Sequence, residues 1–218
     1  MGERVKRKYQ SRIRADAAAA TRAQIRGAAS RLFVDRGYSA TTMREIAEEA
    51  GVSERTVYAV FPTKVALLSE AIGVAIVGDD RPAPVAERAE FRAALSERDG
   101  KKALELFVNG ASEVLERAGA LMMAGYEAAG TDAELRDAAK AGDRARAADF
   151  TLIVNALADH GELRDGVPIE QATDLLLALM SPQVHQMLRH QRARSPDEYR
   201  NLMLDVLQRV ILNPVTAP

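Results

Sequence analysis

The chain has 218 residues, no cysteine and a formal net charge of −1, which excludes a disulfide framework and a thiolate metal site. No stretch approaches a membrane span, and the first residues lack the apolar core of a signal peptide, so we expect a cytoplasmic protein. Aromatic residues make up only 5%, and long Ala-, Leu-, Arg- and Glu-rich segments favour an all-α fold with one small and one medium domain.

The charge is distributed unevenly along the chain. Residues 1–64 contain 13 Lys and Arg against 7 Asp and Glu, whereas the rest contains 17 against 24. A basic N-terminal part and an acidic C-terminal part are typical of a DNA-binding domain joined to a second domain that does not bind DNA. A solvated charge gradient without function is the alternative interpretation.

Residues 1–15 are predicted to form a disordered basic arm, with six Lys and Arg side chains and a single acid, Glu3. An arm of this kind can add phosphate contacts or enter the minor groove. It can equally be an unstructured solubilising tail, and the sequence leaves both possibilities open.

The first predicted helix runs from about Asp16 to Arg36 and ends at Gly37. Apolar residues recur along it at helical spacing, and we expect them to form a core that supports the next two helices. These residues are Ile25, Ala28, Ala29, Leu32 and Phe33.

Residues 41–64 read TTMREIAEEAGVSERTVYAVFPTK and predict two short helices joined by a tight turn. Thr42 and Glu45 have the spacing of a capping box, and Gly51 can adopt the left-handed conformation that ends a helix. Ser53 then caps a second helix from Glu54 to about Val60. This geometry lays a second helix in the DNA major groove, although a hairpin that serves only packing has the same pattern.

The second helix of this motif carries side chains that suit DNA. Arg55, Thr56 and Tyr58 can contact base edges and phosphates, and Lys64 begins the following helix with a cation.

From about Ala19 to Leu68 the chain resembles the N-terminal DNA-binding domain of TetR-family transcriptional regulators. The resemblance rests on the segments LFVDRGY and TTMREIAEEAGVS, on the Thr-hydrophobic-Tyr of the second helix, and on Phe-Pro-Thr-Lys. It implies a helix-turn-helix domain over residues 16–62, formed by three helices. In or over the major groove it places Ser53, Arg55, Thr56 and Tyr58, and on phosphates it places Thr42 and Lys64.

Two positions depart from the family pattern. Such regulators often carry Arg or another polar residue, followed by His or Tyr, where this chain has Ala59 and Val60. The affinity for DNA and the type of operator therefore do not follow from the resemblance.

Residues 63–218 are predicted to form a larger helical domain for ligand binding and dimerisation. Its first helix runs from Thr63 to about Val77, and residues 78–84 break the helical pattern and connect head to body. Further helices are expected over residues 85–97, 101–117, 119–129, 131–160, 169–180, 182–192 and 196–212.

The last helical regions carry two apolar stripes that predict a dimer interface. Paired with their copies, two antiparallel terminal helices would form a four-helix bundle, and a two-fold homodimer matches a palindromic operator in double-stranded DNA. The stripes could instead fold back on their own chain. The predicted interface residues are Leu176, Leu179, Tyr199, Leu202, Met203, Val206 and Val210.

The resemblance also implies a small-molecule effector whose binding releases DNA. Bulky or polar residues on apolar stretches are candidates for its pocket and suggest a mainly apolar ligand, although Met and Phe at helical spacing are more often plain core. Asn155 is the most informative, because a buried amide needs partners. The candidates are Phe107, Met122, Tyr126, Phe150, Asn155 and His185.

An enzyme is the competing class, and the sequence offers little for it. The three histidines are dispersed, and metal-binding, phosphate-binding and nucleophile motifs are missing from the sequence. We therefore expect no catalytic residue, metal or cofactor, and predict a DNA-binding repressor. The alternative is a DNA-binding regulator whose C-terminal domain only dimerises or recruits a protein partner.

Overall fold

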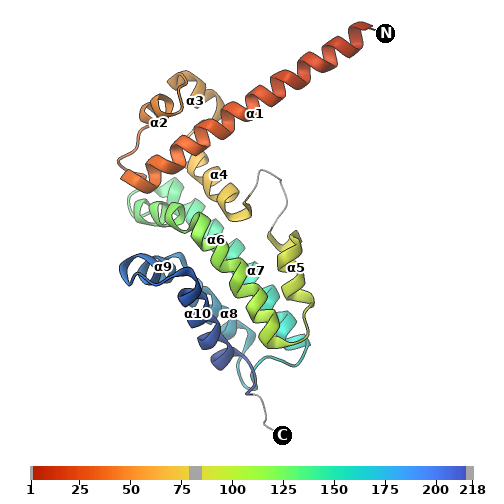
Figure 1. Ribbon diagram of the computed structural model, residues 1–218. Helices are drawn as coiled ribbons and strands as arrows, with labels where there is room; N and C mark the ends of the chain where they lie inside the picture. Colours follow the sequence, from red (N-terminus) through yellow and green to blue (C-terminus); the bar gives the residue numbers. More distant parts are fainter. Residues whose placement is uncertain (1, 79–84, 215–218) are drawn as a thin grey trace. The chain divides into compact units, whose positions relative to one another are not determined.

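The computed structural model describes residues 2–78 and 85–214, and these residues form helices without a β-strand (Figure 1). The all-α prediction is confirmed. The helices are α1 (Gly2–Arg36), α2 (Met43–Glu49), α3 (Glu54–Val60), α4 (Lys64–Val77), α5 (Ala89–Ser96), α6 (Gly100–Ala128), α7 (Ala133–Asp159), α8 (Ile169–Leu179), α9 (Pro182–Gln186) and α10 (Pro196–Ile211), with a 3-10 turn η1 (Val85–Glu87) and a π-helical turn η2 (Met187–Gln191).

The chain divides into two compact units, an N-terminal unit (Met1–Ile72) and a C-terminal unit (Gly73–Pro218). The sequence placed the boundary between residues 62 and 63, at the start of α4, whereas the units meet within that helix. The predicted connection over residues 78–84 lies, beyond Gly78, outside the described residues.

Helix α1 differs from the expected disordered arm, because it begins at Gly2 and not near Asp16. Residues 3–26 contain neither Pro nor Gly. No residue in that segment therefore interrupts the helical hydrogen-bond ladder, and Ala, Lys and Arg favour its continuation.

The core of the N-terminal unit lies where α1 meets α2, α3 and α4. The five apolar residues predicted for the first helix are all buried, as are Ile46 of α2 and Val57 of α3. Thr41 joins them as a fully buried polar residue, and its hydroxyl donates to the carbonyl oxygens of Leu32 and Gly37 at 3.2 and 2.8 Å. The end of α1 is thereby tied to the turn that precedes α2.

In the C-terminal unit, α6 and α7 provide the centre of a core that α5, α8 and α10 complete (Figure 1). Helix α6 is continuous, whereas the sequence predicted a break before Gly119. A Cβ atom at Gly119 would lie 3.5 Å from Nδ1 of His185. That distance is an ordinary van der Waals contact, so Gly119 faces His185 from within a continuous helix and does not end it.

Proline at position 182 separates two helices, as the sequence predicted. Helix α8 ends at Leu179, and Ser181 caps α9 by accepting a hydrogen bond from the amide of Val184 at 3.2 Å. Pro182 occupies the first position of α9, where its missing amide donor costs nothing.

Within the described ranges, no single helix is long and apolar enough to span a membrane. Helices α3 and α4 pass that test only as a pair, and they are bent by 66° at the break between them.

Candidate functional site

The turn between α2 and α3 is closed by backbone hydrogen bonds. The amide of Gly51 donates to the carbonyl of Glu48 at 3.1 Å, and the amide of Val52 donates to that of Ala47 at 3.0 Å. Gly51 has a φ of 64°, in the left-handed region that this end of a helix requires. The sequence therefore fixes locally the angle at which α3 leaves α2.

Both helices of the motif are capped as the sequence predicted. The Thr42 hydroxyl accepts from the amide of Glu45 at 3.2 Å, and the Glu45 carboxylate accepts from the amide of Thr42 at 2.8 Å. The Thr42 hydroxyl also donates to this carboxylate at 2.8 Å, and the hydrogen bonds that the carboxylate accepts from the Thr42 amide and hydroxyl lower the pKa of Glu45. Ser53 caps α3 in the same way, accepting from the amide of Thr56 at 3.1 Å.

Helix α3 presents one face to the core and another to solvent. Val57 is fully buried, whereas Arg55 is exposed and Tyr58 retains 49% of its accessible surface. The hydroxyls of Ser53 and Thr56 lie 2.7 Å apart. The first six residues after the turn thus carry one basic, one aromatic and two hydroxyl side chains. In a recognition helix these N-terminal positions are the ones that contact DNA bases.

Helix α1 holds this motif in place. The side-chain amide of Gln24 donates to the carbonyl of Ala50 at 2.7 Å, in the turn itself. The Arg22 guanidinium forms an ion pair with Glu70 of α4 and lies 4.5 Å above the ring of Phe61. The ends of α2, α3 and the middle of α4 are therefore fixed to one long helix.

The Lys64 side chain contacts the protein itself, whereas the resemblance implies that it binds a DNA phosphate. Its ammonium donates to the carbonyl oxygens of Tyr38 and Thr41 at 2.9 and 2.8 Å and lies 4.1 Å from the centre of the Tyr38 ring. These contacts commit much of its hydrogen-bonding capacity to the segment between α1 and α2, so Lys64 stabilises the motif from within.

The predicted ligand residues are not brought together in one pocket. Phe107 and Phe150 pack edge to face at 4.9 Å between ring centres within the core. Tyr126 is half-buried and donates to Asp143 of α7, and burial together with this carboxylate raises its pKa to about 12. Met122 and Asn155 are half-buried elsewhere on α6 and α7. Phe107 and Phe150 therefore contribute to the core of the C-terminal unit.

His185 lies at the meeting point of α6, α9 and α10. It is buried, its Nε2 atom lies 3.1 Å from Oε1 of Glu116, and its ring meets that of Tyr199 at 5.0 Å between centres. Burial lowers the pKa of His185 more than the nearby carboxylate raises it. The pKa of Glu116 is lowered in turn, chiefly by its hydrogen bonds from Arg189.

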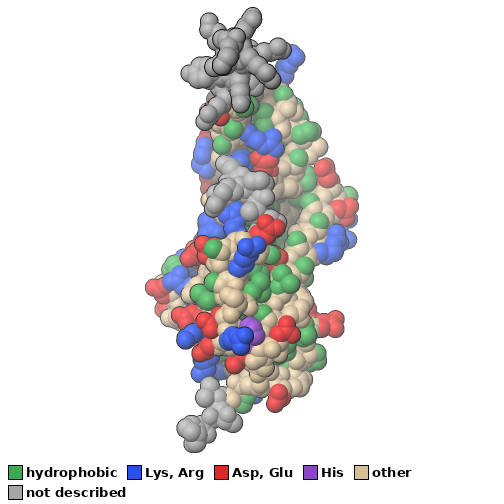
Figure 2. Space-filling view, turned by 90° about the vertical axis from the view of Figure 1, so that its right-hand side faces the viewer, with side chains coloured by type: hydrophobic (Ala, Val, Ile, Leu, Met, Phe, Trp, Pro, Cys, Tyr) green, Lys and Arg blue, Asp and Glu red, His purple; other side chains and the backbone are tan. Residues whose placement is uncertain are grey.

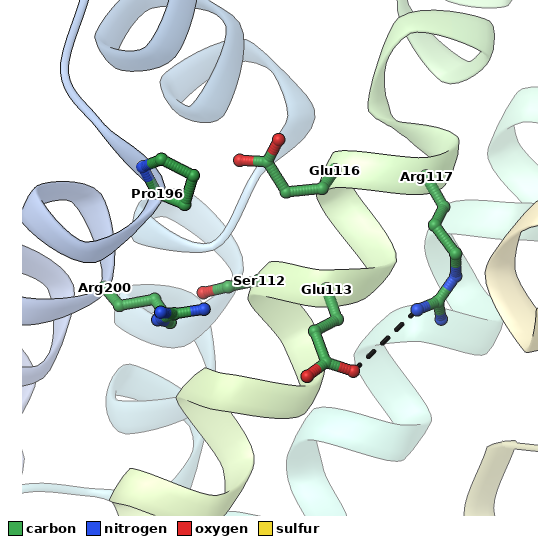
Figure 3. A pocket seen from close by; sticks show the side chains of 6 residues that line it. All are labelled: Ser112, Glu113, Glu116, Arg117, Pro196 and Arg200. Carbon is green, nitrogen blue, oxygen red and sulfur yellow. Dashed lines mark ion pairs between the residues drawn. The ribbon is translucent and has the colours of Figure 1, made fainter.

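A cavity of about 210 Å³ opens beside this cluster, between α6 and the start of α10 (Figure 3). None of the predicted ligand residues lines it. The charged lining residues of α6 have the sequence pattern of a solvated helix face, which does not predict a cavity. Ser112 is the sequence signal for a polar site, because it lies on the same buried stripe of α6 as Val108 and Leu115. The lining consists of Ser112, Glu113, Glu116, Arg117, Pro196 and Arg200.

Arg117 connects this region to the end of α4. Its guanidinium donates to the carbonyl oxygens of Ala75 and Ile76, both at 3.1 Å, and lies 3.8 Å from the Glu113 carboxylate. Carbonyls in the last turn of a helix lack partners within the helix, so α6 supplies the cap that α4 needs.

The surface of the C-terminal unit includes several half-buried apolar residues of the predicted dimer interface. Leu179, Leu202, Val206 and Val210 are half-buried. On the face shown in Figure 2, basic, acidic and apolar side chains are interspersed. The prediction fails for three residues that are buried in the chain's own core and offer no surface to a partner, namely Leu176, Tyr199 and Met203.

Residues 25–71 match the family model described as bacterial regulatory proteins, tetR family. No curated protein matches the chain.

Solved structures with the same fold cover most of the chain. Native NalD of Pseudomonas aeruginosa, the secondary repressor of the MexAB-OprM multidrug efflux pump, is 23% identical over 91% of this chain and 99% of its own, with a TM-score of 0.70. A transcriptional regulator from Saccharomonospora viridis in complex with choline is 22% identical over 90% and 100%, with a TM-score of 0.68. A SmeT–triclosan complex is 21% identical over 91% and 97%, with a TM-score of 0.64.

The family match covers α2 and α3 with the parts of α1 and α4 that hold them. The fold of the rest agrees with that of the solved NalD repressor and of the choline-bound regulator. Residues 25–71 therefore match the tetR family of bacterial regulatory proteins over the helix-turn-helix of the N-terminal unit, and the chain as a whole has the fold of solved transcriptional regulators.

Proposed function

We propose that the chain is a sequence-specific transcriptional repressor, which binds a palindromic operator as a homodimer and is released by a small molecule. The observation that carries this proposal is the capped α2–α3 turn. It positions α3 with Arg55 and Tyr58 facing outward and Val57 buried beneath them.

The DNA contacts follow from the chemistry of these side chains. Arg55 can donate two hydrogen bonds to a guanine edge, whereas Ser53, Thr56 and Tyr58 suit phosphates and bases. Thr42 lies at the positive end of α2, where a phosphate is favoured. Lys64 contributes charge near this surface while its ammonium holds the turn.

The homodimer is supported by apolar side chains that one chain leaves partly exposed. Leu202, Val206 and Val210 follow one another at helical spacing along α10, and Leu179 ends α8. Burying such a stripe against its copy is the usual reason for a two-fold helical interface. A two-fold dimer would present its two α3 helices to the two halves of a palindrome.

Release by a small molecule is supported by two observations. Regulators with this fold have been solved with choline and with triclosan bound. In this chain the cavity shares Arg117 with the cap on α4. A ligand that draws Arg117 away would free the last carbonyls of the helix that begins next to the DNA-binding motif.

The alternative is a body that only dimerises or recruits a protein partner. It would bind the same DNA, but no small molecule would weaken the complex. A screen for molecules that release the selected operator therefore separates the two functions.

The test of DNA recognition is selection of binding sites from random duplex DNA by the purified chain. We expect an enriched palindrome with half-sites at a fixed spacing, and we expect Arg55→Ala to lose discrimination at one base pair, at a cost of about 1–3 kcal/mol. Arg31→Ala is the matched control, because Arg31 is an exposed arginine of the same unit paired with Glu49. An equal loss on all sequences would make Arg55 a phosphate contact, and no enrichment at low salt would refute the proposal.

A further inference from the structure

The cavity between α6 and α10 has a charged lining with no net charge. Glu113 and Glu116 face it from α6, as does Arg117, and Arg200 faces it from α10 (Figure 3). With two carboxylates and two guanidinium groups, the lining suits a ligand that carries both signs and is neutral overall.

Ser112 lines this cavity and contributes a buried hydroxyl that can bind a polar ligand atom. Its side chain is only 3% exposed, and its hydroxyl has no hydrogen-bond partner in the part of the chain that the structure describes. A buried hydroxyl without a partner destabilises the folded chain. A ligand atom that hydrogen-bonds to it would relieve this penalty.

The Arg200 guanidinium forms only a weak ion pair within its own helix. Its partner is Asp197, one turn away, whose side chain is 77% exposed. An ion pair at such an exposed site contributes little, so a carboxylate that also reaches the Ser112 hydroxyl can compete for this guanidinium. In Figure 3 these two side chains project from facing helices into the same space. Arginine binds a carboxylate through two parallel hydrogen bonds, which favours a carboxylate at this end of the cavity.

The cavity also carries negative charge, from Glu113 and Glu116 of α6. Glu113 is 66% exposed and lies 3.8 Å from Arg117, beyond hydrogen-bonding distance. Glu116 is already held by Arg189 and His185. Glu113 is therefore the carboxylate with more capacity for a new cation, and Glu116 adds to the negative potential.

We propose that this cavity binds a small zwitterion of amino-acid size, with its carboxylate on Arg200 and Ser112 and its ammonium toward Glu113 and Glu116. The size follows from the volume of about 210 Å³, which is below the roughly 300–1,000 Å³ of sites for drug-sized molecules. The inference rests on the ligand-responsive regulator proposed above and names the chemical class of its ligand. It replaces the mainly apolar ligand that the sequence suggested.

The direct test is calorimetric titration of the full chain, without DNA, with L-alanine, L-proline and γ-aminobutyrate. We expect at least one of them to bind with a Kd below about 1 mM. Their methyl esters lack the carboxylate and their N-acetyl derivatives lack the ammonium, so both sets should bind at least about tenfold more weakly. No binding of the three zwitterions up to about 20 mM would overturn the proposal. An analogue that binds as tightly as its parent would also overturn it, because a single charge would then be sufficient.

Variants locate the site. Arg200→Gln should weaken binding about tenfold or more and Ser112→Ala about fivefold, whereas Arg209→Gln, on an exposed part of the same helix, should leave it unchanged. Ser112→Ala removes a hydroxyl without a partner, so this variant should fold even if Arg200→Gln does not. Binding that neither variant weakens would place the zwitterion elsewhere and refute the site.

The outcome is separable from that of the DNA-binding proposal. A chain that selects an operator but binds no zwitterion refutes only this inference. A chain that binds a zwitterion at this cavity but selects no DNA refutes the proposed function and leaves the site in place.

Discussion

The ammonium of Lys64 lies against both the backbone and the ring of Tyr38, 2.9 Å from its carbonyl oxygen and 4.1 Å from its ring centre. The start of α4 is thereby fastened to the turn that follows α1. A cation at this position has two possible functions, which are to bind a phosphate or to hold the protein together, and the observed contacts favour the second.

Lys64→Met should therefore lower the free energy of unfolding by about 2 kcal/mol, because it removes two charge-assisted hydrogen bonds and a cation–π contact. Urea unfolding against Lys101→Met measures the effect, since Lys101 is an exposed lysine at the start of α6. A variant as stable as the parent, but with a salt dependence of DNA binding reduced by about one ion, would restore Lys64 to the phosphate contacts.

Gly51→Ala should destabilise the N-terminal unit by about 1–2 kcal/mol, because a Cβ atom is disfavoured at a φ of 64°. Gly110→Ala is the control, since Gly110 lies within α6 and a Cβ atom there meets nothing within 4 Å. It should raise stability by up to about 1 kcal/mol through helix propensity. Thermal unfolding of the two variants should thus shift in opposite directions, and equal shifts would contradict this account of the turn.

Tyr199→Phe should leave the free energy of unfolding unchanged or raise it by about 1 kcal/mol. The Tyr199 ring is fully buried, yet its hydroxyl has no hydrogen-bond partner within the described residues. The same burial raises the pKa of this hydroxyl well above its usual range. Removing an unsatisfied buried group eliminates its desolvation cost while the ring still packs. A loss above about 2 kcal/mol would show that the hydroxyl has a bonded partner such as an ordered water.

Stability should fall as the pH is lowered through and below about 6.5, the usual pKa of histidine. The pKa of His185 is lowered by burial, so the unfolded chain takes up this proton at a higher pH than the folded chain does. The contribution of His185 to stability is therefore complete above the pKa that this residue has in the unfolded chain. It is lost as the pH falls toward the lower pKa that the residue has in the folded chain. Urea unfolding at pH 7.5 and 5.5 should show the loss, and His185→Gln should reduce it. An unchanged pH dependence in that variant would assign the effect to other groups.

The helix-turn-helix could be predicted from sequence because local residues determine it. The capping box of Thr42 and Glu45, the turn at Gly51 and the cap at Ser53 each act within a few residues, and all are found as expected. Gly119 shows where local reasoning fails. The glycine predicted a helix end, but α6 continues through it, and the position faces His185 of another helix.

The cavity could not be predicted for the same reason. Ser112 and Arg200 face one space only because α6 and α10 pack together, and no spacing within either helix records that contact. The apolar stripe of α10 was predicted in part. Sequence periodicity finds the apolar positions of α10, but it does not separate Tyr199 and Met203, which the chain buries itself, from the positions that remain half-buried.

Helices α2 and α3 each have seven residues, and isolated helices shorter than about 12–15 residues are marginal in water. The segment proposed to contact DNA therefore does not supply its own order, but depends on Gln24 and Arg22 of α1. Local opening of these contacts would expose the amides of α3 to hydrogen exchange without unfolding the C-terminal unit. The element proposed to read the operator would then be among the first to lose protection, and DNA would order it on binding.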